Sequence, residues 1–530
     1  MSLSRVRIAC KACRQSKARC EMREAPCTRC TRLGLSCSVQ PGFRREGRRE
    51  RMRQLEDRVQ RLQGLLTDGS SSTETTAATP VIVVATSYTI GEVTLSSGRV
   101  QRLFSVFWQR YHPVLPFLDE SRPAAEYHGE SELLFWFIIS VAARHSSDRS
   151  LLARLMPLVS ERLWTTVAAS APSRGLTQTL VLSSCWPLPD FRLSNDKSVI
   201  HANLALTCLS HLGLHASQED VAAECLRIAC TIQSLSSLSM DQGIPPPASV
   251  SLEIHPHSRI PLALRQNLQI QQWSVRALRT LFGDDACAQL PAAAVFYPTM
   301  ESLERDFDGL CNTLGRGQQL SLTTALRLAA AGLYLDCLYF SETTPGPQRK
   351  QGILRAYKTA GELITTAISH DAAYDELRYS SVATARLLLT AAIVIFRVVH
   401  STYAVSVDVS KAVVLYHSAC FAIHRCSLPD GEEDEEEEEE EGEEKKDKDL
   451  PYRMVEALKL LWRMGETDTS LLSREPSLTV QNRICAGIFF DTVVLWRQYS
   501  RLPAMTLDFL PDMSWDASDW TLFEEAFTNH

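Results

Sequence analysis

The sequence lacks the short motifs by which common enzyme classes are recognised. It contains no P-loop, no dinucleotide-binding fingerprint and no G-x-S-x-G turn. His211 and His215 are four residues apart, as zinc-binding histidines are in HExxH, but "HLGLH" has no glutamate. We therefore predict that the chain is not an enzyme and has no catalytic residues. An enzyme with an accessory zinc module is the less favoured alternative.

Long apolar stretches are also missing, and the chain begins without the apolar core of a signal peptide. Its longest apolar runs, "LLFWFIISVAA" and "TAAIVIF", are shorter than the roughly 20 residues that span a bilayer. These absences predict an intracellular protein without a membrane partner. Most of the 16 cysteines have no regular spacing, which is typical of reduced thiols in the core of such a protein.

Charge is unevenly distributed along the 530 residues, whose net charge is −7. Residues 1–66 contain 17 Lys and Arg but 6 Asp and Glu, so the remainder of the chain is acidic. A basic N-terminal segment on an acidic chain predicts that this segment binds a polyanion.

The same N-terminal segment contains six regularly spaced cysteines. They are Cys10, Cys13, Cys20, Cys27, Cys30 and Cys37. The pattern C-x2-C-x6-C occurs twice, and no histidine lies nearby to supply another ligand. Two tetrahedral zinc sites need eight ligands, so six thiolates fill both sites if two sulfurs bridge the metals. We therefore predict a cluster of two Zn²⁺ ions. One four-thiolate zinc with two spare thiols, or disulfides, is the alternative.

Cationic side chains occupy the intervals between these cysteines. They include Lys11, Arg14, Lys17, Arg19, Arg23 and Arg29. A short helix that begins near Cys13 would present several of them to the major groove of double-stranded DNA, where Lys or Arg donates to guanine. The alternative is that these cations only keep a small domain soluble.

Residues Ala9–Cys37, "ACKACRQSKARCEMREAPCTRCTRLGLSC", resemble the DNA-binding domain of the fungal binuclear zinc cluster transcription factors. The resemblance implies that one zinc is held by Cys10, Cys13, Cys20 and Cys27, and the other by Cys10, Cys27, Cys30 and Cys37. It also implies that Lys17 recognises a CGG-type triplet, while Arg14 and Arg19 contact phosphates. Ser16 stands where the family often has a second basic residue, which is expected to alter the preference among triplets.

Three segments follow the predicted cluster domain, residues 9–38. The composition of residues 39–51 predicts a basic linker, whose Arg44 and Arg45 lie along the phosphate backbone.

The periodicity of residues 52–66 predicts a short coiled coil, with heptad positions Met52, Leu55, Val59, Leu62 and Leu66. Such a helix would pair the chain with a second copy or with a related factor. A single amphipathic helix packed on the rest of the chain is the alternative.

Residues 67–97 are rich in Ser, Thr and Ala, and this composition predicts a flexible linker.

Apolar residues at helical spacing predict an all-α domain over residues 98–425, with buried helices such as "SELLFWFIISVAARH". The phrases "FWQRYHPVLPFLD", "SSCWPLPDFRLSNDKSVIHANLALTCLSHLGLH" and "SLSMDQGIPPP" resemble the fungal-specific regulatory domain, or middle homology region. The likeness is greatest to the branch of leucine-biosynthesis and weak-acid-resistance regulators. It implies a regulatory domain that senses a small-molecule effector.

The C-terminal part contains two acidic segments on either side of predicted helices over residues 450–504. Residues 427–449 predict a solvated, low-complexity loop, because their like charges repel one another. Contact with a transcription cofactor, or coverage of the basic segment, is the alternative. Residues 508–530 predict an activation tail that folds on coactivators through Trp515, Trp520, Leu522, Phe523 and Phe527. A C-terminal helix docked on the rest of the chain is the alternative.

Together these patterns predict a mostly α protein with a small zinc cluster domain, a short coiled coil, a large all-α regulatory domain and disordered acidic segments. The predicted function is a nuclear, sequence-specific RNA polymerase II transcription factor. It would activate a metabolic or secondary-metabolite gene set by binding CGG-type half-sites as a dimer. A ligand-controlled repressor, or a sensor without intrinsic activation, is the alternative.

Overall fold

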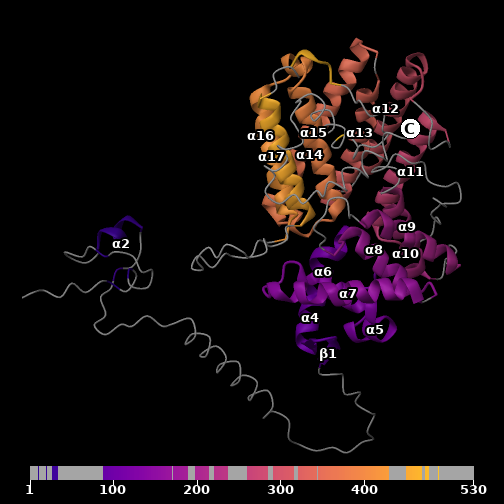
Figure 1. Cartoon of the computed structure of the whole chain (residues 1–530), viewed down its shortest axis with the longest axis vertical. Helices are drawn as coiled ribbons and strands as arrows, with labels where there is room; N and C mark the ends of the chain where they lie inside the picture. The colour runs from indigo at the N-terminus through magenta and orange to yellow at the C-terminus, as the bar shows by residue number, and fades with distance from the viewer. Residues whose placement is uncertain are drawn as a thin grey trace, which may run out of the picture. The chain divides into compact units, whose positions relative to one another are not determined.

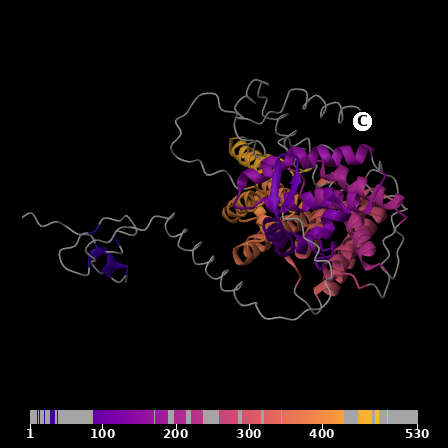
Figure 2. The same ribbon diagram turned by 90° about the horizontal axis from the view of Figure 1, so that it is seen from below.

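The structure is a computed structural model. In it the chain divides into a head unit, Met1–Val83, and a body unit, Val84–His530. The structure describes residues 10, 13, 20, 27–33, 37, 87–169, 171–188, 197–213, 220–236, 259–283, 290–315, 320–342, 344–428, 449–467, 472–476 and 488. Figure 1 and Figure 2 show the helices of the body from two directions.

The described part of the body begins with a β-hairpin of β1 (Ser87–Ile90) and β2 (Val93–Ser96). The strands are antiparallel, and Ile90 pairs with Val93, so two residues form the turn. Gly91 has a φ of 52° in this turn, a conformation that glycine adopts without strain.

This hairpin lies within residues 67–97, for which the composition predicts a flexible linker. Instead, Tyr88, Val93 and Leu95 are buried on one face of the hairpin and belong to the core of the body. The alternation of buried and exposed residues has the two-residue period of a strand. At residues 87–96 the structure therefore differs from the predicted linker, because tertiary packing orders a segment whose composition is polar.

The first half of the body consists of helices around α6. Its elements are α4 (Ser97–Val106), the π-helical turn η1 (Phe107–Tyr111), η2 (His112–Val114), α5 (Ala124–Glu130), α6 (Glu132–Ala143), α7 (Arg149–Ala169), α8 (Arg174–Cys185), α9 (Ser198–His211) and α10 (Val221–Leu235). Ser131 caps α6 by accepting a hydrogen bond from the backbone N–H of Leu134. Nearly every residue of α6 is buried, which confirms the buried helix predicted for "SELLFWFIISVAARH".

The second half of the body is a bundle of longer helices. Its elements are α11 (Leu262–Phe282), α12 (Ala293–Gly315), α13 (Leu322–Ser341), α14 (Pro347–Tyr374), η5 (Leu377–Tyr379), α15 (Val382–Val399), η6 (Thr402–Ser406), α16 (Val409–Arg425) and α17 (Leu450–Thr467). By length and composition α15 could cross a membrane, but 83% of it is buried inside the body. The sequence analysis found shorter apolar runs here, because Arg386 and Arg397 interrupt this helix.

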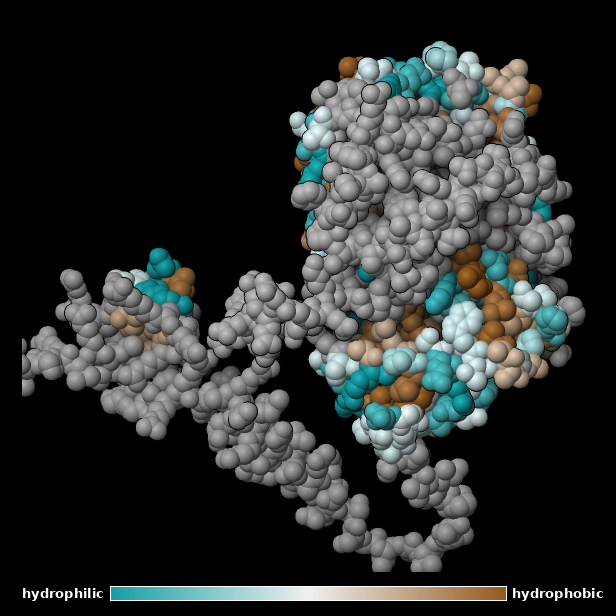
Figure 3. Space-filling view, viewed as in Figure 1, coloured by the Kyte–Doolittle hydropathy of each residue, from teal (hydrophilic) through white to brown (hydrophobic). Residues whose placement is uncertain are grey.

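Each half of the body has its own hydrophobic cluster, and polar contacts join the two halves. The indole N–H of Trp186 donates to the carbonyl oxygens of Tyr379 at 3.2 Å and Ser380 at 3.1 Å. Arg386 on α15 donates to the hydroxyl of Ser198 on α9 at 2.5 Å. On the face shown in Figure 3, hydrophobic and hydrophilic residues are intermingled on the described surface of the first half.

The predicted mostly α fold is confirmed, since helices make up nearly all of the regular structure in the described ranges. None of the described cysteines forms a disulfide. The predicted basic linker, coiled coil and activation tail lie outside the described residues, as do residues 429–448 of the predicted acidic loop.

Candidate metal centre

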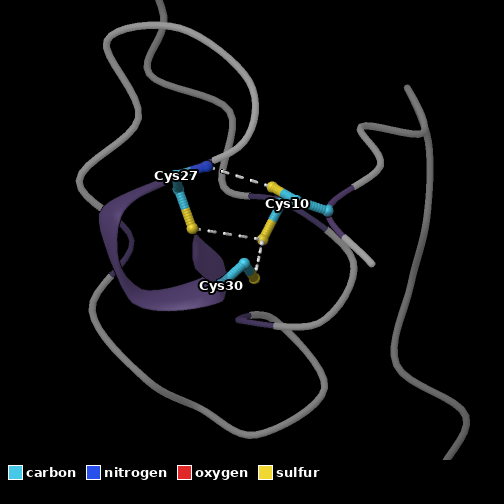
Figure 4. A group of neighbouring side chains, drawn as sticks. Cys10, Cys27 and Cys30 are labelled. Carbon is cyan, nitrogen blue, oxygen red and sulfur yellow. Dashed lines mark hydrogen bonds between the residues drawn. The ribbon is translucent and has the colours of Figure 1, made fainter. Parts of the chain in front are cut away.

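Two of the six regularly spaced cysteines are positioned by the short helix α2 (Thr28–Arg32) of the head. Cys27 has an extended backbone, with a φ of −67° and a ψ of 152°, and stands at the N-cap. Cys30 lies in the first turn of α2, so the C-x2-C spacing brings both sulfurs to the same side. Figure 4 shows the sulfurs of Cys27 and Cys30 converging with that of Cys10.

Burial of these thiols is nearly complete. Cys10, Cys13, Cys27 and Cys30 have side chains at most 1% exposed, and the partly buried Cys20 and Cys37 pack against them. The hydrophobic cluster that the structure describes in the head consists of these cysteines alone. An aliphatic core is therefore replaced by thiols, as in small domains that a metal holds together.

Distances between the sulfurs fit shared metal coordination. Cys10 Sγ lies 3.9 Å from Cys27 Sγ and 3.7 Å from Cys30 Sγ, and Cys13 Sγ lies 3.7 Å from Cys27 Sγ. A disulfide would need about 2.0 Å. Two thiolates bound to one tetrahedral zinc, with bonds of about 2.3 Å, are about 3.8 Å apart. The observed spacings therefore match zinc coordination and exclude covalent pairing.

The sulfurs form two groups of four, each with its ligand atoms within 4.8 Å of one another. One group contains Cys10, Cys13, Cys20 and Cys27, and the other contains Cys10, Cys27, Cys30 and Cys37. Cys10 and Cys27 belong to both groups. Six thiols therefore provide two four-ligand sites, as the doubled sequence pattern predicts.

Backbone hydrogen bonds repeat between the two C-x2-C-x6-C arms. The backbone N–H of Cys10 donates to the sulfur of Cys20 at 3.5 Å, and that of Cys27 donates to Cys37 at 3.3 Å. In each arm the backbone N–H of the first cysteine therefore donates a hydrogen bond to the sulfur of the third cysteine. Such donors stabilise negative charge on a sulfur and orient it toward a metal.

Electrostatic surroundings make the thiols unequal. A hydrogen bond from the backbone N–H of Cys30 lowers the pKa of Cys27 to about 6, whereas burial raises the pKa of Cys20 to about 12. Burial also raises the pKa of Cys30. Because thiolates are the zinc-binding form, a bound cation is required to keep all six sulfurs ionised.

Arg29 contributes positive charge beside the thiol cluster. Its Nη1 donates to the sulfur of Cys13 at 3.9 Å. Six thiolates and two Zn²⁺ ions leave a surplus of two negative charges, which a nearby guanidinium partly offsets. The sequence analysis counts Arg29 only among the cations between the cysteines. Its contact with Cys13 depends on the turn of α2 and has no signal in the spacing.

The described residues place the six predicted zinc ligands together. The predicted DNA-contacting residues Lys11, Arg14, Lys17, Arg19, Arg44 and Arg45 lie outside the described residues. The same is true of the dimerisation residues Met52, Leu55, Val59, Leu62 and Leu66, and of the activation residues Trp515, Trp520, Leu522, Phe523 and Phe527.

Comparison with known proteins agrees with this geometry. Residues 8–46 match the fungal Zn(2)-Cys(6) binuclear cluster domain. The chain is 32% identical over 133 residues to the transcriptional regulatory protein SEF1 of Candida albicans, and 28% identical over 132 residues to the putative transcription factor SEF1 of Saccharomyces cerevisiae. These alignments cover 25% of this chain but 14% and 11% of the two relatives.

A more distant relative aligns along most of the chain. The regulatory protein LEU3 of Saccharomyces cerevisiae is 20% identical over 652 residues, which cover 94% of this chain and 71% of that relative. No solved structure matches the chain.

The head therefore contains a fungal Zn(2)-Cys(6) binuclear cluster domain, which binds two zinc ions. A quarter of the chain is similar to the transcriptional regulatory protein SEF1, and most of it aligns with the regulatory protein LEU3.

Proposed function

We propose that the chain is a sequence-specific RNA polymerase II transcription factor that acts in the nucleus and activates a metabolic or secondary-metabolite gene set. The observation that carries this proposal is the pair of four-thiol groups that share Cys10 and Cys27. In the proposed assignment these two sulfurs bridge the zinc ions, and Cys13, Cys20, Cys30 and Cys37 are terminal ligands. Binding of the two metals then folds the head into a conformation that can recognise DNA.

Recognition of DNA is assigned to the cations between the first three cysteines. Lys17 donates to guanine in a CGG-type half-site, where O6 and N7 of guanine accept from lysine in the major groove. Phosphate contacts by Lys11, Arg14, Arg19, Arg44 and Arg45 add affinity that falls with salt. In support, the described Arg29 and Arg32 are two cations on α2, and Arg29 contacts the thiol cluster through Cys13.

Two chains are proposed to bind together. One triplet is a short target, so a dimer joined through residues 52–66 gains affinity from two linked half-sites. The partner is a second copy or a related factor. Residues 508–530 recruit coactivators through aromatic side chains among acidic groups. The body is proposed to bind a small-molecule effector that controls this output.

In vitro site selection with the zinc-loaded full chain tests the DNA-binding proposal. A pool of random duplexes should become enriched in paired CGG-type triplets, and a zinc chelator should abolish the enrichment because it unfolds the head. Recovery of sequences without a common triplet from the zinc-loaded chain would refute it. Enrichment of single triplets would refute the dimer but not the triplet contact.

A fusion experiment separates an activator from a repressor or passive sensor. Residues 508–530 attached to an unrelated DNA-binding domain should activate a reporter. A matched fusion with Trp515, Trp520 and Phe523 changed to Ala keeps the acidic charge and should lose most of that activity. Equal output from both fusions would contradict recruitment through the aromatic side chains, and an inactive native fusion would favour the repressor or sensor.

A further inference from the structure

The two arms of the thiol cluster, residues 10–20 and 27–37, share their cysteine spacing but differ in charge at a matching position. The residue before the second cysteine of the C-x2-C pair is Ala12 in the first arm and Arg29 in the second arm. A methyl group cannot donate a hydrogen bond, whereas a guanidinium has five N–H donors. The sequence repeat therefore does not make the two zinc sites chemically equivalent.

Arg29 belongs to the second arm but contacts a ligand of the first. It lies on α2, and its half-buried side chain donates from Nη1 to the sulfur of Cys13 at 3.9 Å. Cys13 belongs to a single four-thiol group, which also contains Cys10, Cys20 and Cys27. The guanidinium therefore lies beside the first zinc site and joins the two arms.

The backbone of Arg29 is held on both sides. Cys27 stands at the N-cap of α2 and Cys30 in its first turn, and both belong to the thiol cluster. The backbone N–H of Leu33 also donates to the carbonyl oxygen of Arg29 at 3.1 Å. Because the backbone is already fixed, the contact with Cys13 restricts only side-chain torsions, which lowers its entropic cost.

Cys30 is the counterpart of Cys13 in the second four-thiol group. Its sulfur lies 3.7 Å from that of Cys10, as Figure 4 shows. Among the residues that the structure describes, no cationic side chain donates to Cys30. The two terminal ligands therefore differ, because the guanidinium contact is made to Cys13 alone.

Repulsion between thiolates links this difference to metal retention. Six thiolates and two Zn²⁺ ions leave two surplus negative charges, so the ligands repel one another. Zinc release begins when a terminal Zn–S bond breaks and water takes the vacant position. A sulfur that stays hydrogen-bonded to Arg29 remains near the metal and can bind it again, and the positive charge offsets part of the repulsion.

We propose that Arg29 stabilises zinc at the first site, so that the zinc of the second site, with terminal ligands Cys30 and Cys37, is lost first. Arg29 is a positioning residue, because it acts through Cys13. Loss of the second zinc leaves the four thiols of the first group in place. A chain that is partly depleted of zinc therefore keeps a complete metal site in the first arm, which carries the proposed DNA contacts.

An EDTA challenge of the zinc-loaded full chain tests the order of release. Zinc that remains on the chain is measured by elemental analysis after desalting at successive times. The native chain should lose about two equivalents in two phases, whose rates differ by about tenfold or more. In Arg29→Met the slow phase should become about tenfold faster, so that both zinc ions leave almost together. A single phase in the native chain, or an unchanged slow phase in Arg29→Met, would overturn the proposal.

Thiol alkylation identifies the zinc that leaves first. Iodoacetamide, added during the challenge, should modify Cys30 and Cys37 before Cys13 and Cys20 in the native chain. Mass spectrometry of the digested chain records the order. In Arg29→Met the four thiols should be modified at similar rates. Earlier modification of Cys13 than of Cys30 in the native chain would refute the assignment.

Two further variants separate the contact from general effects. Arg32→Met is the matched control, because Arg32 is an exposed cation on the same helix and donates to none of the described cysteines. It should leave both phases unchanged, and an acceleration equal to that of Arg29→Met would assign the effect to net charge and refute the contact. Arg29→Lys keeps the charge and a donor, so it should keep two phases even if Arg29→Met does not retain zinc; a single phase would contradict the proposal. DNA is absent from these measurements, so their result is independent of the proposed DNA recognition.

Discussion

Replacement of Cys27 by alanine distinguishes a shared thiol from an ordinary one. Cys27 belongs to both four-thiol groups, and its sulfur is 3.9 Å from that of Cys10 and 3.7 Å from that of Cys13. The matched change is Cys37→Ala, because Cys37 belongs to the second group alone. Each change removes one sulfur from the head. The two variants differ only in how many zinc sites lose a ligand: two sites in Cys27→Ala and one in Cys37→Ala.

The structure sets the size of the expected effect. Cys27→Ala leaves three thiols in each group, so both sites lose a ligand that structural zinc requires. Cys37→Ala leaves the group of Cys10, Cys13, Cys20 and Cys27 complete. The zinc content should therefore fall from about two equivalents per chain to nearly none in Cys27→Ala, and to about one in Cys37→Ala.

Elemental analysis of the purified, desalted full chain measures these contents. Titration of a CGG-type duplex on the same samples should show no specific binding by Cys27→Ala, because the metal-free head is unfolded. Far-UV circular dichroism is the control for the helical body, whose signal should be retained in both variants. Two equivalents of zinc in Cys27→Ala, or equal losses in the two variants, would refute the assignment of Cys27 as a shared ligand.

Three further predictions concern DNA contact, helix packing and pH. Lys17→Ala should weaken binding to a CGG-type duplex by about 1–3 kcal/mol and leave binding to random duplexes almost unchanged; an unaltered triplet preference in a competition assay would exclude its role in recognition. Gly352→Ala on α14 should lower the free energy of unfolding by about 1–3 kcal/mol, because the new methyl group would lie 2.3 Å from the ring of Tyr339. Gly309→Ala on α12, where no atom lies within 4 Å, should raise it by about 1 kcal/mol; thermal shifts of the same sign would contradict this packing. Burial lowers the pKa of His145 in the folded chain to about 3, below its ordinary 6.5. As the pH falls below 6.5, His145 therefore takes up a proton in the unfolded chain but not in the folded chain, and the free energy of unfolding decreases. His145→Gln should make that fall shallower in urea titrations between about pH 6.5 and 4, and an unchanged slope would assign it to other groups.

Much of the metal centre could be predicted from the sequence, because its chemistry is local. The C-x2-C spacing at Cys27 and Cys30 spans one helical turn, so two sulfurs are brought together by backbone geometry alone. The doubled pattern also predicts the sharing of sulfurs, because six ligands cannot fill two separate sites. The contact of Arg29 with Cys13 was not predictable, since it joins the two arms across a fold that spacing does not describe.

The hairpin at residues 87–96 shows how tertiary packing overrides composition. Its strands are short and lie next to a segment rich in Ser and Thr, so the alternation of apolar and polar residues over residues 87–96 is a weak signal against the composition of residues 67–97. Tyr88 and Leu95 are buried because the first half of the body provides a hydrophobic face for them. A two-stranded hairpin is marginal in water by itself, and packing against helices makes it stable.

The sequence alone determined that the head has a thiol-rich metal domain and that the body is helical, because ligand spacing and hydrophobic periodicity are properties of neighbouring residues. The tertiary structure alone decided where Arg144 and His201 lie, since they come from different helices and meet at a cavity between two halves. No periodicity or motif connects them. Packing between helices that are far apart in the sequence sets their surroundings: the Nε2 of His201 is buried without a hydrogen-bond partner, and Nη1 of Arg144 donates to the carbonyl oxygen of Pro187.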